Sequence, residues 1–101
     1  MNKFHALVVM ATTLGVGPTA FAADNNLGRD IAANCANCHG TNGRSVGLIA
    51  SLAGRPQGEI VLILKEFRDG KRPSTVMQQL ARGYTDAQIE AVAGYLAAQK
   101  P

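Results

Sequence analysis

The chain has 101 residues, which is the length of one domain, and 47% of them are hydrophobic. The net charge at pH 7 is only +3, and Glu66 and Asp69 interrupt the basic residues between positions 65 and 72. This pattern is typical of a solvated helix face and gives no support for nucleic-acid binding. With no tryptophan and only two cysteines, so short a chain needs a disulfide or a large buried cofactor to support its core.

The start of the chain has the pattern of a secretory signal peptide. A polar start with one lysine precedes an apolar stretch that reaches Val16, and Ala20-Phe21-Ala22 matches an A-x-A cleavage site. We therefore expect a signal peptide over residues 1–22 and one mature domain over residues 23–101. A retained membrane anchor is the alternative, but the apolar stretch is shorter than the ~20 residues of a spanning helix. We expect no membrane span after cleavage.

A first helix is predicted from Leu27 to about Cys38, because Leu27 and Ile31 fall on one side at helical spacing. Residues 40–54 are rich in glycine, serine and asparagine, which predicts a loop. Three apolar residues of this loop are expected to be buried: Leu48, Ile49 and Leu52.

A second helix is predicted over residues 57–69, with Pro56 at its start and Gly70 at its end. The apolar run from Ile60 to Leu64 would also suit a buried strand, but the length of the segment favours a helix. A short helical piece is predicted from Met77 to Ala81.

The last helix is predicted after Thr85, which forms a capping-box pattern with Gln88. Apolar residues then recur at i, i+3, i+4 and i+7, namely Ile89, Val92, Ala93 and Leu96. No useful length of sequence alternates with period two, so the predicted fold class is all-α.

Cys35-Ala36-Asn37-Cys38-His39 is a C-x-x-C-H motif, the signature of covalent haem attachment. Two thiols one helical turn apart can add to the two vinyl groups on one porphyrin edge. A histidine directly after the second cysteine then lies beneath the iron. The motif predicts one covalent haem c attached through Cys35 and Cys38, with His39 as an axial metal ligand.

Other interpretations of the motif have specific requirements. A disulfide oxidoreductase centre calls for a βαβ pattern, and the sequence offers no strands. A closed zinc site usually has four ligands, and no second Cys/His cluster exists. A structural disulfide would be strained at this spacing and would give His39 no role.

Met77 is the candidate for the second axial ligand. It is the only methionine of the predicted mature chain, and His39 is its only histidine, so a His/His haem cannot form within one chain. A lone methionine is ordinarily a core residue, but Met77 lies in a polar stretch. The alternatives are an open or water-bound iron, or ligation by Lys65 or Lys71.

Four further segments share a pattern with a known family: Leu52-Ala53-Gly54, Phe67-Arg68-Asp69-Gly70-Lys71-Arg72, Thr75-Val76-Met77 and Ala93-Gly94-Tyr95-Leu96. Together with the haem motif, they make residues 26–99 resemble the class I cytochromes c. The resemblance is nearest to cytochromes c4, c553-type carriers and the haem subunit of flavocytochrome c sulfide dehydrogenases. It implies the small class I cytochrome c fold, with three to five helices around one haem.

The resemblance also implies contacts within this fold. The first and last helices are expected to cross, with Gly28 close to Gly94 or Tyr95. Leu52 is expected to bind the cofactor by packing on the haem, and Met77 to bind the iron.

The family resemblance also concerns two positions next to the expected haem. The resemblance implies that Arg72 lies near a haem propionate. Position 50 holds alanine where the family usually has proline. There the resemblance implies a carbonyl that accepts the proton of the second nitrogen of His39.

The function expected from these residues is one-electron transfer in the bacterial periplasm, with no catalytic residue in the chain. Three hypotheses stay open. The first is a soluble carrier between redox protein partners, and the second is the haem subunit of a flavoprotein that oxidises sulfide. The third is a gas sensor in which Met77 leaves the iron.

Overall fold

The structure is a computed structural model that describes residues 14–15 and 26–101. Apart from Leu14 and Gly15, the predicted signal peptide over residues 1–22 lies outside the described residues. The helices of the described chain are α1 (Leu27–His39), the 3₁₀ turn η1 (Thr41–Gly43), α2 (Gln57–Arg68), α3 (Met77–Ala81) and α4 (Asp86–Ala97). Residues 26–101 contain no strand, so the predicted all-α class is confirmed.

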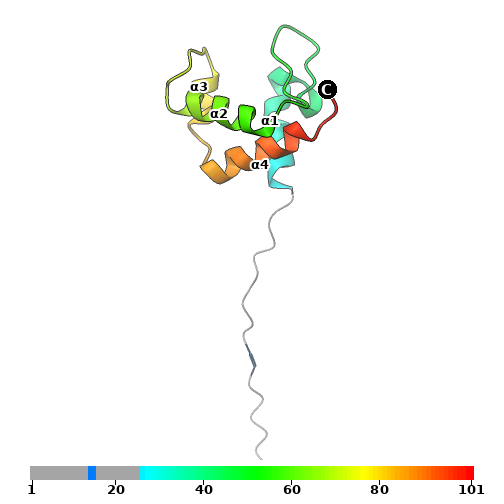
Figure 1. Ribbon diagram of the computed structural model, residues 1–101, viewed down its shortest axis with the longest axis vertical. Helices are drawn as coiled ribbons and strands as arrows, with labels where there is room; N and C mark the ends of the chain where they lie inside the picture. The colour runs from blue at the N-terminus through cyan, green and yellow to red at the C-terminus, as the bar shows by residue number, and fades with distance from the viewer. Residues whose placement is uncertain (1–13, 16–25) are drawn as a thin grey trace, which may run out of the picture.

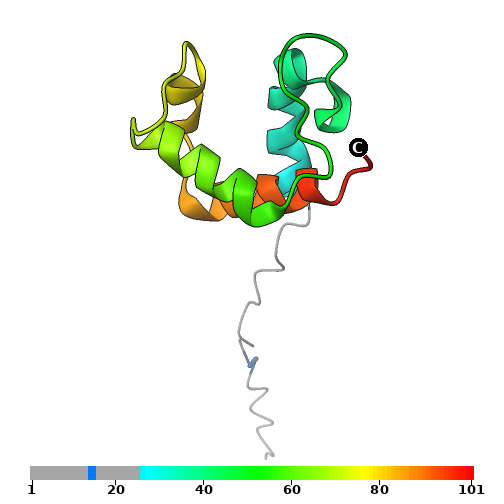
Figure 2. The ribbon, with the colours of Figure 1, turned by 45° about the horizontal axis from the view of Figure 1, so that its top comes forward.

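The helices form a base with two lobes (Figures 1 and 2). Helices α2 and α4 lie side by side in the base. Helix α1 and the loop after it form one lobe, and α3 with the segment between α2 and α3 forms the other. The two lobes therefore stand on the same side of the base and face each other.

The described hydrophobic core lies where α1, α2 and α4 meet. Only two large side chains of the described residues, Ile89 and Leu96, are fully buried. Burying one such side chain contributes about 1.5–3 kcal/mol, so this core supplies little stability for a chain of this length. The core cluster consists of Ile31, Ala32, Ile60, Val92, Ala93 and Leu96.

Helices α1 and α4 approach each other most closely at Gly28. A Cβ on Gly28 would overlap the backbone carbonyl of Ala91 and lie 3.0 Å from the Cβ of Tyr95. The predicted closeness of Gly28 to Tyr95 is thus confirmed. Gly94 instead faces the side chain of Gln57 on α2, because it lies on another side of α4.

We expect Gly28→Ala to destabilise the protein by about 1–3 kcal/mol, because the added methyl must push two packed helices apart. Urea denaturation would measure the loss. Gly58→Ala is the matched control, since a Cβ there meets no atom within 4 Å, and it should be neutral or stabilise the helix by up to about 1 kcal/mol. Equal stability of Gly28→Ala and the wild type would contradict the close packing.

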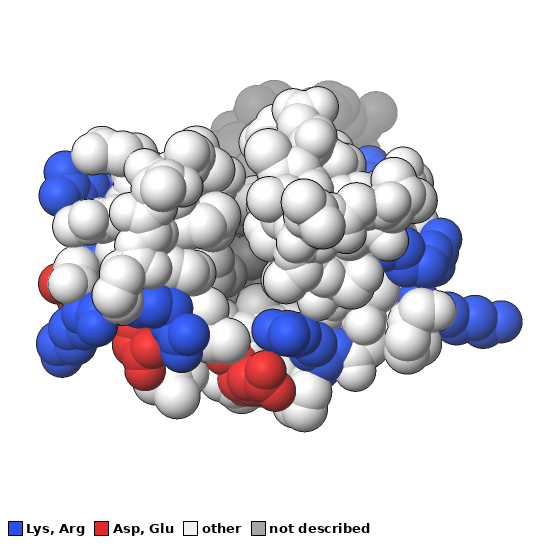
Figure 3. All heavy atoms as spheres, turned by 90° about the horizontal axis from the view of Figure 1, so that it is seen from above, with Lys and Arg blue, Asp and Glu red and all other residues white. Residues whose placement is uncertain are grey.

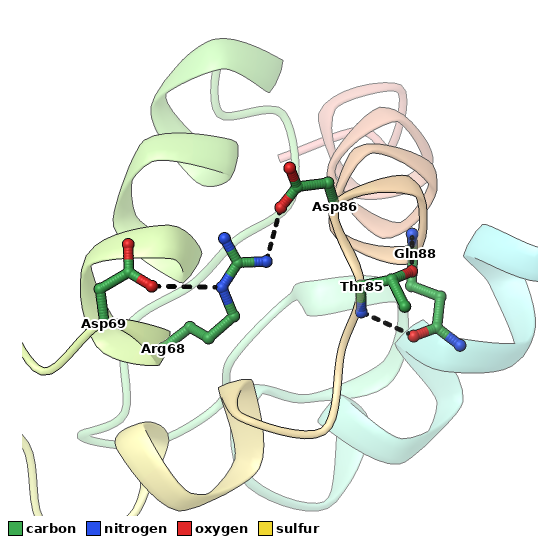
Figure 4. A network of polar contacts seen from close by, with 5 residues as sticks. All are labelled: Arg68, Asp69, Thr85, Asp86 and Gln88. Atoms are coloured by element: carbon green, nitrogen blue, oxygen red, sulfur yellow. Dashed lines mark hydrogen bonds and ion pairs between the residues drawn. The ribbon is translucent and has the colours of Figure 1, made fainter.

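The start of α4 is fixed by a cap and an ion pair (Figure 4). Thr85 Oγ1 accepts a hydrogen bond from the Gln88 amide at 3.2 Å, and Gln88 Oε1 accepts one from the Thr85 amide at 2.9 Å. The predicted capping box is therefore confirmed. Arg68, the last residue of α2, donates to Asp86 at 2.6 Å and to Asp69 at 3.4 Å. The pair with Asp86 ties the end of α2 to the beginning of α4.

This ion pair predicts a pH dependence of stability. The hydrogen bond from Arg68, followed by the charge of Lys65, lowers the pKa of the Asp86 carboxyl below its ordinary value. The stabilisation is therefore present above the unfolded pKa of about 3.9 and is lost as the pH falls through the lower folded pKa. We expect Asp86→Asn to have a lower urea midpoint than the wild type at pH 7. Below about pH 4 the two urea midpoints should become nearly equal.

The control for this prediction is Glu90→Gln, which makes the same charge change on an exposed side chain of α4. Within the described chain no ion pair is found for Glu90. The urea midpoint of Glu90→Gln should differ little from that of the wild type, both at pH 7 and below about pH 4. A deficit of Asp86→Asn that stays constant from pH 7 to pH 3 would show that the ionised carboxylate is not what stabilises the fold.

The loop between η1 and α2 differs in part from the prediction. Leu48 is fully exposed and Ile49 is half exposed, so the expectation that both are buried is wrong. The cause is local: the Ser45 amide donates to Ser51 Oγ at 2.8 Å. This bond closes the segment on itself and leaves its apolar side chains outside the core. Leu52 is half-buried, because its amide is bound to the Gly43 carbonyl at 2.7 Å.

Candidate haem-binding site

A cavity of about 540 Å³ lies between the two lobes, above α2. Seen from above, it opens as a groove between the lobes (Figure 3). Most of its walls are apolar, and α2 contributes Ile60, Ile63, Leu64 and Phe67. A cavity of this size and character suits a large flat cofactor, since binding sites for such groups are mainly apolar with a few polar groups in fixed places.

All the site residues predicted from the sequence line this one cavity: Cys35, Cys38, His39, Leu52 and Met77. The two cysteines and the histidine lie at the C-terminal end of α1, and Met77 is the first residue of α3. The histidine and the methionine therefore come from opposite lobes. The fold brings together residues that are 38 positions apart in the chain.

The ring of His39 is fixed by a backbone contact. Its Nδ1 lies 2.6 Å from the carbonyl oxygen of Ala50. When Nδ1 carries the proton it donates to this carbonyl, which leaves Nε2 without a proton and free to bind a metal. Alanine at position 50 thus provides the carbonyl contact that the family resemblance implied.

The turn after His39 depends on glycine. Gly40 has a φ of 86°, and a Cβ at this position would overlap the Arg44 carbonyl. Because only glycine adopts this conformation without strain, the chain can leave α1 sharply. It then returns past the histidine ring and presents Ala50.

The two cysteines are free thiols and form no disulfide with each other. Cys35 is half-buried, and its Sγ donates to the Ile31 carbonyl at 3.5 Å. Burial raises the pKa of the Cys35 thiol, whereas a disulfide oxidoreductase needs a thiol of low pKa. Within the described residues no group of three or more His, Cys, Asp or Glu residues could hold a metal ion. The thiols thus suit covalent attachment better than redox exchange or zinc binding.

Met77 has no competing lysine in this cavity. Neither Lys65 nor Lys71 is among the residues that line it, so the geometry gives no support for lysine ligation. The turn before α3 is held by the Gln78 amide, which donates to Ser74 Oγ at 2.9 Å. Met77 therefore starts a short helix whose first turn is tied to the preceding segment.

Two arginines reach the cavity, of which only Arg72 was expected. Arg72 is bound to Glu66 through Nε and Nη2, both at 3.0 Å, and its guanidinium carbon lies 5.7 Å from the centre of the Phe67 ring. Arg55 also lines the cavity and was not predicted. Its position directly after the Leu52-Ala53-Gly54 element was the only signal that could have indicated it.

These features together fit a covalently held haem. The chain provides two free thiols on one helical turn, an imidazole with one nitrogen already satisfied, a thioether on the facing lobe and apolar walls between them. The structure therefore defines a small all-helical haem-protein domain. When bound, haem supplies an iron that changes its oxidation state by one electron.

The sequence profile of cytochrome c matches residues 26–100. The chain belongs to the cytochrome c family, and the cofactor of this family is haem c. The chain is 37% identical over 78 residues to the cytochrome subunit of sulfide dehydrogenase of Chlorobaculum tepidum, covering 77% of this chain and 71% of that protein.

Two further matches are cytochromes c4. The protein of Pseudomonas aeruginosa is 35% identical over 102 residues, which cover 99% of this chain and 50% of the relative. The structure of Acidithiobacillus ferrooxidans cytochrome c4 superposes with a TM-score of 0.68 at 33% identity, over 80% of this chain and 52% of that one. The fold is therefore that of a class I cytochrome c, and the chain spans about half the length of these c4 relatives.

The relatives are cytochromes and electron-transfer subunits. This agrees with the prediction that the chain itself carries electrons and is not an enzyme. Within the described residues, no helix is both long and apolar enough to cross a membrane.

Proposed function

We propose that the chain transfers single electrons in the bacterial periplasm as a soluble carrier, through one haem c ligated by His39 and Met77. The observation that carries this proposal is the single cavity lined by both residues, one from each lobe. His39 and Met77 would hold the haem iron from the two lobes and would leave no position on it open to a substrate. The haem would supply one-electron oxidation and reduction.

The protein contributes fixed geometry and a dry surrounding to this transfer. The contact between His39 and the Ala50 carbonyl holds the imidazole in one orientation and increases its basicity as a ligand. The apolar walls limit the approach of water. A methionine sulfur as the second ligand favours the ferrous form and raises the reduction potential relative to two histidines.

The sequence supports the proposed location and the proposed number of haems. Residues 1–22 carry the predicted signal peptide, which supports export to the periplasm. The chain contains two cysteines, both in one C-x-x-C-H motif, which supports one covalent haem per chain.

A second candidate function is the haem subunit of a flavoprotein that oxidises sulfide. The relative from Chlorobaculum tepidum supports this alternative, since the match extends over 71% of that cytochrome subunit. In this arrangement the chain would accept electrons from a flavin on its partner and would contain no substrate site itself.

Purification from the native periplasm, with absorption spectra before and after reduction, tests the function. Haem bands on a particle of the size of one chain would support the free carrier. A co-eluting flavin whose signal bleaches when sulfide is added would establish the subunit instead. Protein without covalently bound haem would overturn both functions.

A further inference from the structure

The carbonyl that contacts His39 belongs to a loop, residues 45–51, that has few other contacts. This loop is part of the α1 lobe (Figure 2). Ala50 is exposed, so packing against the core does not hold it in place. Among the described residues, no backbone–backbone hydrogen bond begins or ends within residues 45–51. The position of the Ala50 carbonyl therefore depends on the two ends of the loop and on side-chain hydrogen bonds.

Both ends of the loop are fixed by backbone hydrogen bonds. Before the loop, the Arg44 amide donates to the Thr41 carbonyl at 3.1 Å. After it, the amides of Leu52 and Ala53 donate to the Gly43 carbonyl at 2.7 Å and 3.1 Å. These bonds bring the two ends together, but they place no constraint on the residues between them.

One hydrogen bond closes the loop itself. Ser51 Oγ accepts from the Ser45 amide at 2.8 Å, which is within the normal range for a strong N–H···O contact. Ser51 directly follows Ala50, so this bond restricts the directions in which the Ala50 carbonyl can point. The other side-chain bonds between residues of the loop join Ser45 Oγ to the backbone of Gly47, and they do not involve Ala50 or Ser51.

We propose that Ser51 is a positioning residue for the axial histidine, because its hydroxyl holds the Ala50 carbonyl against Nδ1 of His39. This inference rests on the haem site of the proposed function. A hydrogen bond from Nδ1 makes the imidazole a more basic ligand. A more basic ligand favours the ferric iron and lowers the reduction potential. Loss of the Ser51 hydroxyl therefore weakens the contact of His39 and raises the potential.

The test compares haem-loaded Ser51→Ala with the wild type through two properties of the histidine ligand. Hydrogen exchange of the His39 Nδ1 proton, followed by NMR in the reduced protein, should be about 2- to 10-fold faster in the variant, the factor that corresponds to one ordinary hydrogen bond. The midpoint potential from a redox titration should be higher. Ser51→Thr keeps the hydroxyl and should restore both values.

Limited proteolysis measures the constraint on the loop independently of the iron. Leu48 lies in the middle of the loop and is fully exposed. A protease that cuts after leucine should cleave Ser51→Ala faster than the wild type at this residue, because a loop must open to enter the protease. Cleavage of both proteins at the same rate would overturn the proposal, since the bond would then not constrain the loop.

Ser45→Ala is the matched control. It removes a hydroxyl of the same size from the same loop, but it keeps the amide that donates to Ser51. Its Nδ1 exchange and its potential should stay near the wild-type values. If Ser51→Ala changes these two properties no more than Ser45→Ala, the positioning role is overturned while the electron-transfer function stands. A wild-type protein that carries no covalent haem would overturn both the function and this inference.

Discussion

Replacing Met77 by alanine is expected to abolish the weak long-wavelength sulfur–iron absorption band of the oxidised protein and to open the iron to carbon monoxide after reduction. The reduction potential should fall by on the order of 0.1–0.2 V, part of the roughly 0.8 V over which axial ligands tune haem. The reason is the loss of the only thioether that lines the cavity within the described chain. Absorption spectroscopy and a redox titration would measure the three effects.

Leu80→Ala is the control for this variant. Leu80 lies on the same short helix, lines the same cavity and is half exposed, but it offers no atom to the iron. The control should keep the sulfur band and bind no carbon monoxide. A wild-type protein that lacks the band at neutral pH, or a Met77→Ala variant that keeps it, would show that Met77 is not the ligand.

The elements of the fold could be predicted because local signals agreed with the final structure. The capping box at Thr85 marks the start of α4, and the C-x-x-C-H motif coincides with the end of α1. The periodicity of the apolar residues then separates helices from loops. Each of these signals acts within one or two helical turns, so a single sequence is enough to find it.

The features that could not be predicted depend on contacts between distant segments. Leu48 and Ile49 are apolar, but the bond between Ser45 and Ser51 determines which way they face. Arg55 lines the cavity in a segment whose approach to α2 is fixed by bonds such as those of the Gly43 carbonyl to the amides at positions 52 and 53. A sequence pattern does not contain such bonds.

The site residues could be predicted from the sequence only in part. The spacing within Cys35-Ala36-Asn37-Cys38-His39 describes the chemistry of attachment without any tertiary contact. The role of Met77 requires that α3 faces α1 across the cavity, and the sequence indicated this residue by elimination and by the family resemblance. The structure shows that the two lobes face each other across the cavity. That Met77 binds the iron stays a prediction, which the Met77→Ala experiment tests.

Loss of the haem is expected to unfold the domain, which we would test with a Cys35→Ala/Cys38→Ala variant from which the haem has been extracted. The cavity of about 540 Å³ has mostly apolar walls, and loss of the haem exposes these walls to water. Burial of one large apolar side chain contributes about 1.5–3 kcal/mol. A domain of this length has a total stability of roughly 4–12 kcal/mol, so losing the burial of several such side chains is comparable with everything that holds the fold together.

Circular dichroism during heating would measure this effect, with the single variant Cys38→Ala, which keeps one thioether, as the control. The single variant should retain its haem and melt in one sharp transition. The extracted double variant should lose its sharp transition, because its described core contains only two fully buried large side chains. If the extracted double variant melts sharply, at a temperature within a few degrees of that of the haem-loaded protein, then α1, α2 and α4 are stable without the haem. The covalent attachment would then serve to retain the cofactor and would not be needed to complete the core.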